Sequence, residues 1–84
     1  MNYSVEWLEE AEDELATIWL QAGDPPLVAS AQVEIDRLLA RDPLGNGQYL
    51  SEGLRQIVVK PLTASYSVDG SRRRVEVSWV RYTP

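Results

Sequence analysis

The chain has 84 residues, of which 44% are hydrophobic, and a formal net charge of −5 from 13 carboxylates and 8 basic side chains. This length predicts a single domain over residues 1–84, because no linker or internal repeat divides it. With no cysteine and no histidine, disulfides, thiol nucleophiles, His-based acid–base catalysis and ordinary zinc sites are excluded, and no metal or cofactor is expected. No apolar stretch approaches the ~20 residues that cross a bilayer. The acidic N-terminus does not resemble a secretory signal, so we expect a cytoplasmic protein that does not interact with membranes.

The first half of the chain predicts one strand followed by two helices. Residues 2–7 alternate between apolar and polar side chains, as a half-buried strand does. Over residues 8–22 apolar side chains recur every three or four positions, which is the stripe of an amphipathic helix, and Gly23 is expected to end it. Asp24 followed by proline predicts the start of a second helix, whose apolar stripe covers residues 28–39. The short connection predicts that the two helices lie side by side as a hairpin.

The second half of the chain predicts three strands. Residues 44–48 are rich in turn-forming residues. The strand expected at residues 54–60 contains the run Ile57-Val58-Val59, which predicts burial on both faces. Residues 62–68 and 74–79 then alternate in polarity on either side of a hairpin signal, Asp69-Gly70.

The predicted order is β-α-α-β-β-β, an α+β fold in which a helical hairpin packs on one face of a small antiparallel sheet. The opposite face is expected to be polar and open, and it carries Thr63, Ser65, Ser67, Arg74, Glu76 and Ser78. Tyr66 is predicted to be a core residue. The three tryptophans are predicted to be core residues as well, with Trp7 and Trp79 on the apolar face of the sheet and Trp19 on the first helix. An exposed tryptophan would instead mark the place where a partner helix docks.

The charges are divided unevenly along the chain. Residues 1–54 hold eleven carboxylates and two arginines, a net charge of −9, whereas residues 55–84 hold six basic residues and two carboxylates, a net charge of +4. A basic surface attracts phosphate-rich or acidic partners. We therefore expect the functional residues to lie in the last thirty positions.

Several strings along the chain resemble the RelE/ParE superfamily of toxins from type II toxin–antitoxin systems, and the resemblance spans essentially the whole sequence. It implies a RelE/ParE-like fold and a cognate antitoxin as partner. Members of this superfamily either cut messenger RNA in the ribosomal A site or inhibit DNA gyrase, and their antitoxins block them. The strings are Tyr3-Ser4-Val5-Glu6-Trp7, Ile35-Asp36-Arg37-Leu38-Leu39, Gly53-Leu54-Arg55, Tyr66-Ser67-Val68-Asp69 and Val75-Glu76-Val77.

The resemblance also implies candidate catalytic residues for RNA cleavage without a metal. Arg55 and Lys60 match basic residues that the family places on its second strand, Arg81 matches an arginine near the end of the last strand, and Tyr82 lies close to a late tyrosine. In such a reaction an arginine would neutralise the charge of the pentavalent phosphate. Structural alternatives exist for each residue: pairing of the two arginines with carboxylates of the helical half, a solvated lysine at a strand end, and a tyrosine that frays with the terminus.

Arg72, Arg73 and Arg74 form the densest positive charge in the chain. They could bind nucleic acid or a protein target through phosphate or carboxylate contacts, or they could form a solvated hairpin tip. Both interpretations remain open at the level of sequence.

Two departures from the RNA-cutting branch favour gyrase inhibition. Thr63 occupies a position at which those members usually carry an arginine, and the chain is acidic where most of them are basic. The sequence therefore predicts a growth-arresting toxin that acts on DNA gyrase. Two alternatives are a ribosome-dependent mRNA endonuclease, the one case in which the protein would be an enzyme, and a non-toxic relative that serves as an interaction module.

Overall fold

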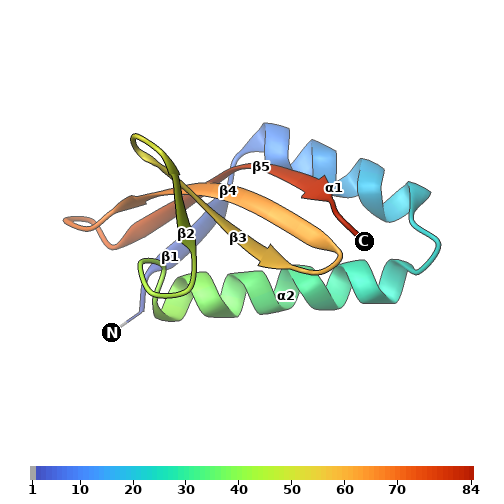
Figure 1. Ribbon diagram of the computed structural model, residues 1–84, viewed down its shortest axis with the longest axis horizontal. Helices are drawn as coiled ribbons and strands as arrows, with labels where there is room; N and C mark the ends of the chain where they lie inside the picture. The colour runs from blue at the N-terminus through green and yellow to red at the C-terminus, as the bar shows by residue number, and fades with distance from the viewer. Residues whose placement is uncertain (1) are drawn as a thin grey trace.

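Two helices pack on one side of a five-stranded sheet in residues 2–84, the part of the chain that this computed structural model describes (Figure 1). Met1 lies outside the described residues. In chain order the elements are β1 (Ser4–Trp7), α1 (Glu9–Gln21), α2 (Pro25–Arg41), β2 (Gln48–Ser51), β3 (Leu54–Val59), β4 (Leu62–Asp69) and β5 (Arg74–Tyr82). The predicted α+β class is confirmed, together with the order of the first strand, the two helices and the last three strands.

The sheet differs from the predicted one in two respects. Its strand order is β1-β5-β4-β3-β2, and β1 runs parallel to β5 while the other pairs are antiparallel, so the sheet is mixed. In addition, β2 forms where the sequence indicated only turns. All four residues of β2 are exposed, so the strand carries no hydrophobic alternation by which it could have been recognised, and only its backbone pairing with β3 defines it.

The two helices begin and end for different reasons. Three carboxylates occupy the first turn of α1, where they interact favourably with the helix dipole. This helix ends at Gln21 with an extended Ala22 and without a left-handed glycine, because Gly23 has no positive φ. The predicted start of α2 is confirmed, since the Asp24 carboxylate accepts a hydrogen bond from the backbone N–H of Leu27 at 3.3 Å.

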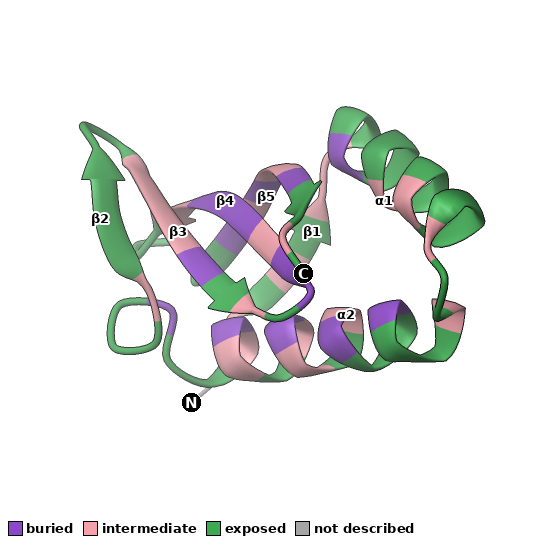
Figure 2. Ribbon diagram, turned by 45° about the vertical axis from the view of Figure 1, so that its right-hand side comes forward, coloured by how far each residue is buried: buried purple, intermediate pink, exposed green. Residues whose placement is uncertain are grey.

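The helices form a hairpin that opens away from its connection (Figure 2). They contact each other, but α1 packs mainly against β5 whereas α2 packs against β1, β3 and β4. They are therefore splayed rather than packed side by side along their whole length. Both contribute to one core, whose buried members are Ala11, Val28, Ala31, Ile35, Leu39, Ile57, Leu62, Ala64, Tyr66, Val75, Val77 and Val80.

A bulge at Ser78 determines which residues of β5 face the core. Tyr66 pairs with Val77 and Ser65 pairs with Trp79, so Ser78 is an extra residue with no partner on β4. One extra residue moves every later side chain to the opposite face. Val80 is consequently buried, and Trp79 lies on the polar face. The prediction that Trp79 belongs to the apolar face is therefore wrong.

The second half of β5 is covered by α1 instead of by another strand. β1 pairs with β5 only as far as Val77, so the edge of β5 beyond that point has no neighbouring strand on this side. The side chain of Glu14 on α1 fills the gap, because its Oε1 accepts a hydrogen bond from the backbone N–H of Val80 at 3.0 Å. An acidic helix is thereby placed beside the basic end of β5.

Candidate functional site

The polar face of the sheet carries a row of hydroxyl groups on β4, on β5 and on Thr83, which directly follows β5. The Ser65 and Ser78 hydroxyls lie 3.2 Å apart, and those of Thr63 and Thr83 lie 2.8 Å apart. This face is polar as predicted, but it is not open at its centre. Ser65 has no exposed surface, and its partner across the strand pair is the half-buried Trp79.

Arg81 stacks on Trp79 on this polar face. Its guanidinium carbon lies 4.3 Å from the centroid of the indole ring, the geometry of a cation–π contact. Arg81 and Tyr82 also line a 380 Å³ hollow together with Asp13 and Glu14 of α1. Even so, no carboxylate within residues 2–84 forms an ion pair with Arg81. The positioning of this arginine therefore comes from an aromatic ring and not from the acidic helix.

Three of the four candidate catalytic residues gather at one end of the sheet. Lys60 is exposed in the turn between β3 and β4, and Tyr82, which is 46% exposed, pairs with Leu62 just after that turn. Arg81 precedes Tyr82 on β5. Lys60, Arg81 and Tyr82 are thus neighbours in the fold even though the first is about twenty positions away from the others in the sequence.

Arg55 lies apart from these three residues. It is on the helix-side face of the sheet, opposite the face that carries Arg81, whereas Tyr82 pairs with the buried Leu62 and lies on the helix-side face as well. Arg55 pairs with Tyr66, whose side chain is fully buried in the core, so the side chain of Arg55 points to the helix side. There its Nη2 atom donates hydrogen bonds to the backbone carbonyls of Leu44 at 2.9 Å and Gly47 at 3.0 Å. Arg55 holds the loop between α2 and β2, and the structure does not bring it to Arg81.

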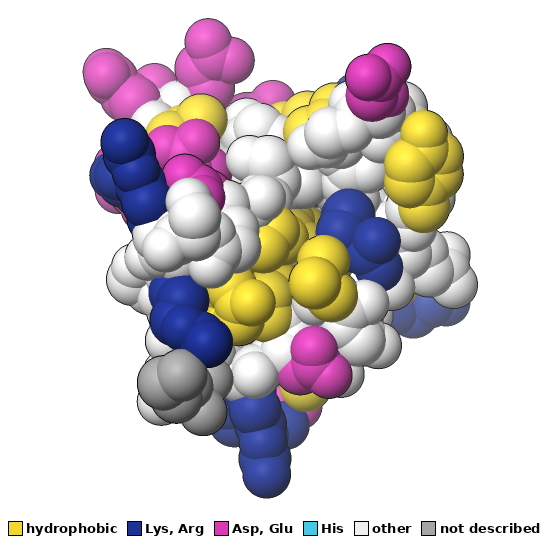
Figure 3. All heavy atoms as spheres, turned by 90° about the vertical axis from the view of Figure 1, so that its left-hand side faces the viewer, with side chains coloured by type: hydrophobic (Ala, Val, Ile, Leu, Met, Phe, Trp, Pro, Cys, Tyr) yellow, Lys and Arg dark blue, Asp and Glu magenta, His cyan; other side chains and the backbone are white. Residues whose placement is uncertain are grey.

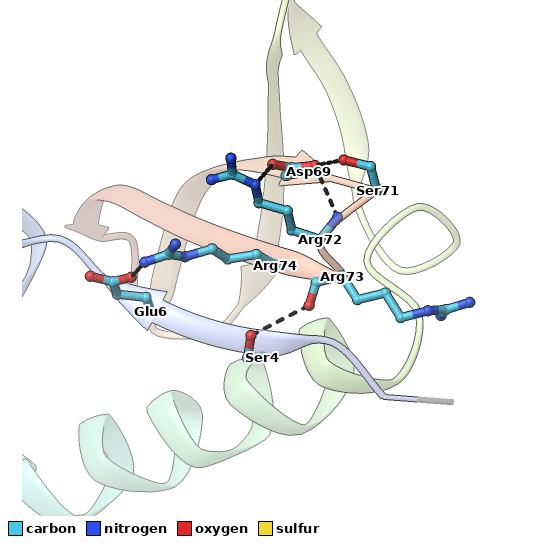
Figure 4. Close-up of polar contacts among 7 residues, drawn as sticks. All are labelled: Ser4, Glu6, Asp69, Ser71, Arg72, Arg73 and Arg74. Atoms are coloured by element: carbon cyan, nitrogen blue, oxygen red, sulfur yellow. Dashed lines mark hydrogen bonds and ion pairs between the residues drawn. The ribbon is translucent and has the colours of Figure 1, made fainter.

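The arginine cluster at the tip of the β4–β5 hairpin is divided in the fold (Figure 4). Arg72 lies 3.8 Å from a carboxylate oxygen of Asp69, and Arg74 forms an ion pair with Glu6. Arg73 adopts a left-handed backbone with φ of 51°, and its guanidinium carbon lies 5.5 Å from the centre of the Tyr3 ring. The three side chains point in different directions, and the charges of two of them are matched by carboxylates.

The ionisation of the hairpin groups reflects these contacts. The hydrogen bond from the Ser71 hydroxyl, followed by that from the Arg72 backbone N–H, lowers the pKa of Asp69 below its ordinary range. The hydrogen bond with Glu6 raises the pKa of Arg74. Both groups therefore remain charged at neutral pH, and carboxylates match the charges of Arg72 and Arg74 at the tip.

A groove between the two helices contains the tryptophan that sequence patterning misplaced. Trp19 is 48% exposed and is not the core residue that the helical stripe predicted. It lines a groove of 610 Å³ whose remaining walls are Trp7, Glu12, Leu15, Ala16, Leu20 and Gln32. The indole of Trp7 is fixed by a 2.6 Å hydrogen bond from its Nε1 to Asp36. Trp19 therefore meets the condition, exposure to solvent, under which a docking site is expected at a tryptophan.

Two further properties concern the described residues alone. Residues 2–84 contain no group of three or more His, Cys, Asp or Glu side chains that could hold a metal ion. None of the helices in that range is long and apolar enough to span a membrane.

Two solved structures of toxin–antitoxin systems are similar to this chain over its whole length. A chain of the toxin–antitoxin complex RelBE2 from Mycobacterium tuberculosis superposes with a TM-score of 0.81 and 23% identity, covering 98% of this chain and 99% of that one. A chain of the chromosomal ParDE system of P. aeruginosa gives a TM-score of 0.71 and 18% identity, covering 98% and 97%. No protein-family model and no curated protein matches the sequence. The chain therefore shares its fold with these two solved structures.

Proposed function

We propose that this protein is the toxin of a type II toxin–antitoxin module and that it arrests growth by inhibiting DNA gyrase. The observation that carries the choice of target is the separation of Arg55 from Arg81. Arg55 is bound to loop carbonyls on the helix side of the sheet, whereas Arg81 stacks on Trp79 on the polar side. Metal-free RNA cleavage needs a base for the 2′-hydroxyl and cations around the phosphate in one place. The similarity in fold to chains of RelBE2 and ParDE complexes supports the toxin assignment.

The gyrase proposal is tested with purified protein and supercoiled plasmid. We expect the protein to inhibit supercoiling and to accumulate cleaved DNA complexes, because a binding inhibitor traps an intermediate without any chemistry of its own. Arg81→Ala is tested alongside the wild-type protein. This variant should retain the fold, because Arg81 is exposed. If saturating protein produces neither inhibition nor cleaved complexes, gyrase is not the target.

Ribosome-dependent mRNA cleavage is the second candidate, and the grouping of Lys60, Arg81 and Tyr82 at one end of the sheet favours it. In this reaction Arg81 would neutralise the phosphate charge, and Lys60 would need a depressed pKa to act as a base. Translating ribosomes with a defined message provide the assay. Cleavage that disappears in Arg81→Ala would establish this mechanism, whereas an intact message at saturating protein would exclude it.

The groove at Trp19 is the proposed contact for the antitoxin. Leu15, Trp19 and Leu20 share an apolar surface on α1, while Glu9, Glu10 and Glu12 make the start of the same helix acidic. An amphipathic segment with an apolar stripe and basic flanks would complement both features. Because such a segment is disordered before it binds, the apolar contacts must offset its cost of ordering.

Trp19→Ala tests this contact in cells. The gene next to that of the toxin is co-expressed, and its product is expected to restore growth to cells that carry the wild-type toxin. We expect Trp19→Ala cells to remain arrested despite co-expression, because truncating a tryptophan at an interface commonly costs 2 kcal/mol or more, roughly thirtyfold in affinity. Val33→Ala, which alters a 66% exposed residue of α2 outside the groove, should still be rescued. Equal rescue of both variants would place the antitoxin elsewhere.

A further inference from the structure

The hydrogen-bond donors of Arg55 are only partly satisfied by residues 2–84. Its Nη2 atom donates both of its hydrogen bonds to carbonyls, while its Nε atom is buried and has no partner among residues 2–84. Its Nη1 atom also lacks a partner in that range, and no carboxylate there forms an ion pair with it. A guanidinium has five N–H donors in a planar fork that matches a carboxylate. Because Nε is buried and Nη2 is bound to the loop, the N–H groups of Nη1 are the donors left for a carboxylate.

Apolar side chains stand next to this guanidinium. Arg55 lines a pocket of 220 Å³ whose apolar walls are Leu44, Tyr49, Leu54 and Val68; we call it the Arg55 pocket. Leu44 is 57% exposed and Tyr49 is 70% exposed, which is costly for large apolar groups unless they are covered. Leu44, one of these walls, belongs to the loop that follows α2.

The pocket lies at a free sheet edge. β2 is the last strand in the sheet order and pairs only with β3, so one side of Gln48–Ser51 presents unpaired backbone groups. Tyr49 pairs with Arg55, and their side chains therefore share one face. Figure 3, which looks onto the end of the molecule that carries the β2–β3 hairpin, shows hydrophobic side chains gathered between Lys and Arg side chains. An exposed edge beside an apolar pocket is a known arrangement for adding a peptide strand.

We propose that the Arg55 pocket and the free edge of β2 bind an extended segment of a partner protein that carries an apolar residue and a carboxylate two positions apart. The edge supplies backbone hydrogen bonds, the walls of the pocket take the apolar side chain, and Arg55 takes the carboxylate. The spacing of two follows from strand geometry, in which alternate side chains lie on one face. An acidic segment suits this site, whereas the groove at Trp19 suits a basic one. Binding here is independent of whether gyrase or the ribosome is the target.

A blocked peptide serves as the probe: acetyl-Thr-Leu-Thr-Glu-Thr-amide, in which leucine and glutamate fall on one face and the only carboxylate is that of glutamate. It is titrated into the ¹⁵N-labelled full chain while backbone amide shifts are followed by NMR. We expect shifts at residues 48–51 and around Arg55. The same peptide with glutamine in place of glutamate should bind about tenfold more weakly, because the charge-assisted hydrogen bond is lost.

Two variants and one matched control keep the test decisive. Arg55→Gln should reduce binding of the glutamate peptide to that of the glutamine peptide. Since Arg55 also holds a loop, Tyr49→Ala provides a second variant at a 70% exposed residue, and it should weaken both peptides equally. Arg37→Gln changes an exposed arginine on α2 whose partner is Glu34, and it should have no effect.

Three results would overturn the proposal. The first is the absence of shifts along β2 at millimolar peptide, and the second is equal affinity for the two peptides. The third is binding of N-acetyl-leucine at the pocket without binding of the glutamate peptide, which would indicate a site for a small carboxylate and not for a protein segment.

Discussion

Replacing Gly47 by alanine is expected to lower the free energy of unfolding by roughly 2–4 kcal/mol. A Cβ atom at this position would overlap the Tyr66 hydroxyl and lie 2.8 Å from the backbone carbonyl of Gln56. Tyr66 is fully buried and cannot move aside. Its hydroxyl donates a 2.6 Å hydrogen bond to the carbonyl of Pro43, and this bond would be broken or distorted. Urea denaturation followed by circular dichroism measures the change.

Gly70→Ala is the matched control for this substitution. Nothing lies within 4 Å of the position that its Cβ would occupy, and its φ is not positive, so the free energy of unfolding should change by less than about 0.5 kcal/mol. A Gly47→Ala protein as stable as Gly70→Ala would show that the loop between α2 and β2 can change its conformation at little cost in free energy. The contacts of Tyr66 and Arg55 would then not fix that loop.

Ile35→Ala should have a comparable or larger effect, roughly 2–5 kcal/mol. Ile35 has no exposed surface and lies in the middle of α2, against the core face of the sheet. Removing three of its carbon atoms leaves a cavity between two rigid layers that collapses only partly. A chain of 84 residues has a modest total stability, so this one change could leave a large fraction of the protein unfolded at 37 °C.

Val33→Ala separates packing from helix propensity, since it alters a 66% exposed residue of the same helix. Alanine is the better helix former, and this variant should be as stable as the wild type or slightly more stable. Equal destabilisation by Ile35→Ala and Val33→Ala in urea would contradict the placement of α2 on the sheet.

The sequence predicted the elements well because most of them carry a periodic apolar pattern. Both helices and the strands β3, β4 and β5 bury one face, and their alternation or helical stripe records it. β2 could not be found in this way, because its four residues are all exposed. Such a strand is defined by its neighbour in space and not by its own composition.

The faces of the sheet were harder to predict than its strands. The bulge at Ser78 exchanges the faces of Trp79 and Val80. The alternating pattern of apolar and polar side chains does not show where such an extra residue lies. For Arg55 the signal was present. Arg55 lies two positions before Ile57 and therefore on the same face, and Val58, which is 53% exposed, lies on the other. The expectation that the run Ile57-Val58-Val59 is buried on both faces hid this alternation of side chains along the strand.

The candidate site was only partly predictable for a related reason. Sequence order alone could not bring Lys60 next to Arg81, nor show that Glu6 neutralises Arg74, because these contacts depend on how the strands pair. The candidate surfaces are an apolar groove at Trp19, a stacked Trp79–Arg81 pair and the Arg55 pocket.

Induction of the protein alone in a bacterial host is the most direct test of whether it is a growth-arresting toxin that inhibits gyrase. Incorporation of labelled thymidine and labelled methionine is followed over the first minutes after induction. We expect growth to stop and thymidine incorporation to fall before methionine incorporation. An earlier fall in methionine incorporation would identify translation as the target and return Lys60, Arg81 and Tyr82 to the role of catalytic residues. Unchanged incorporation of both labels would contradict the toxin function itself and indicate an interaction module.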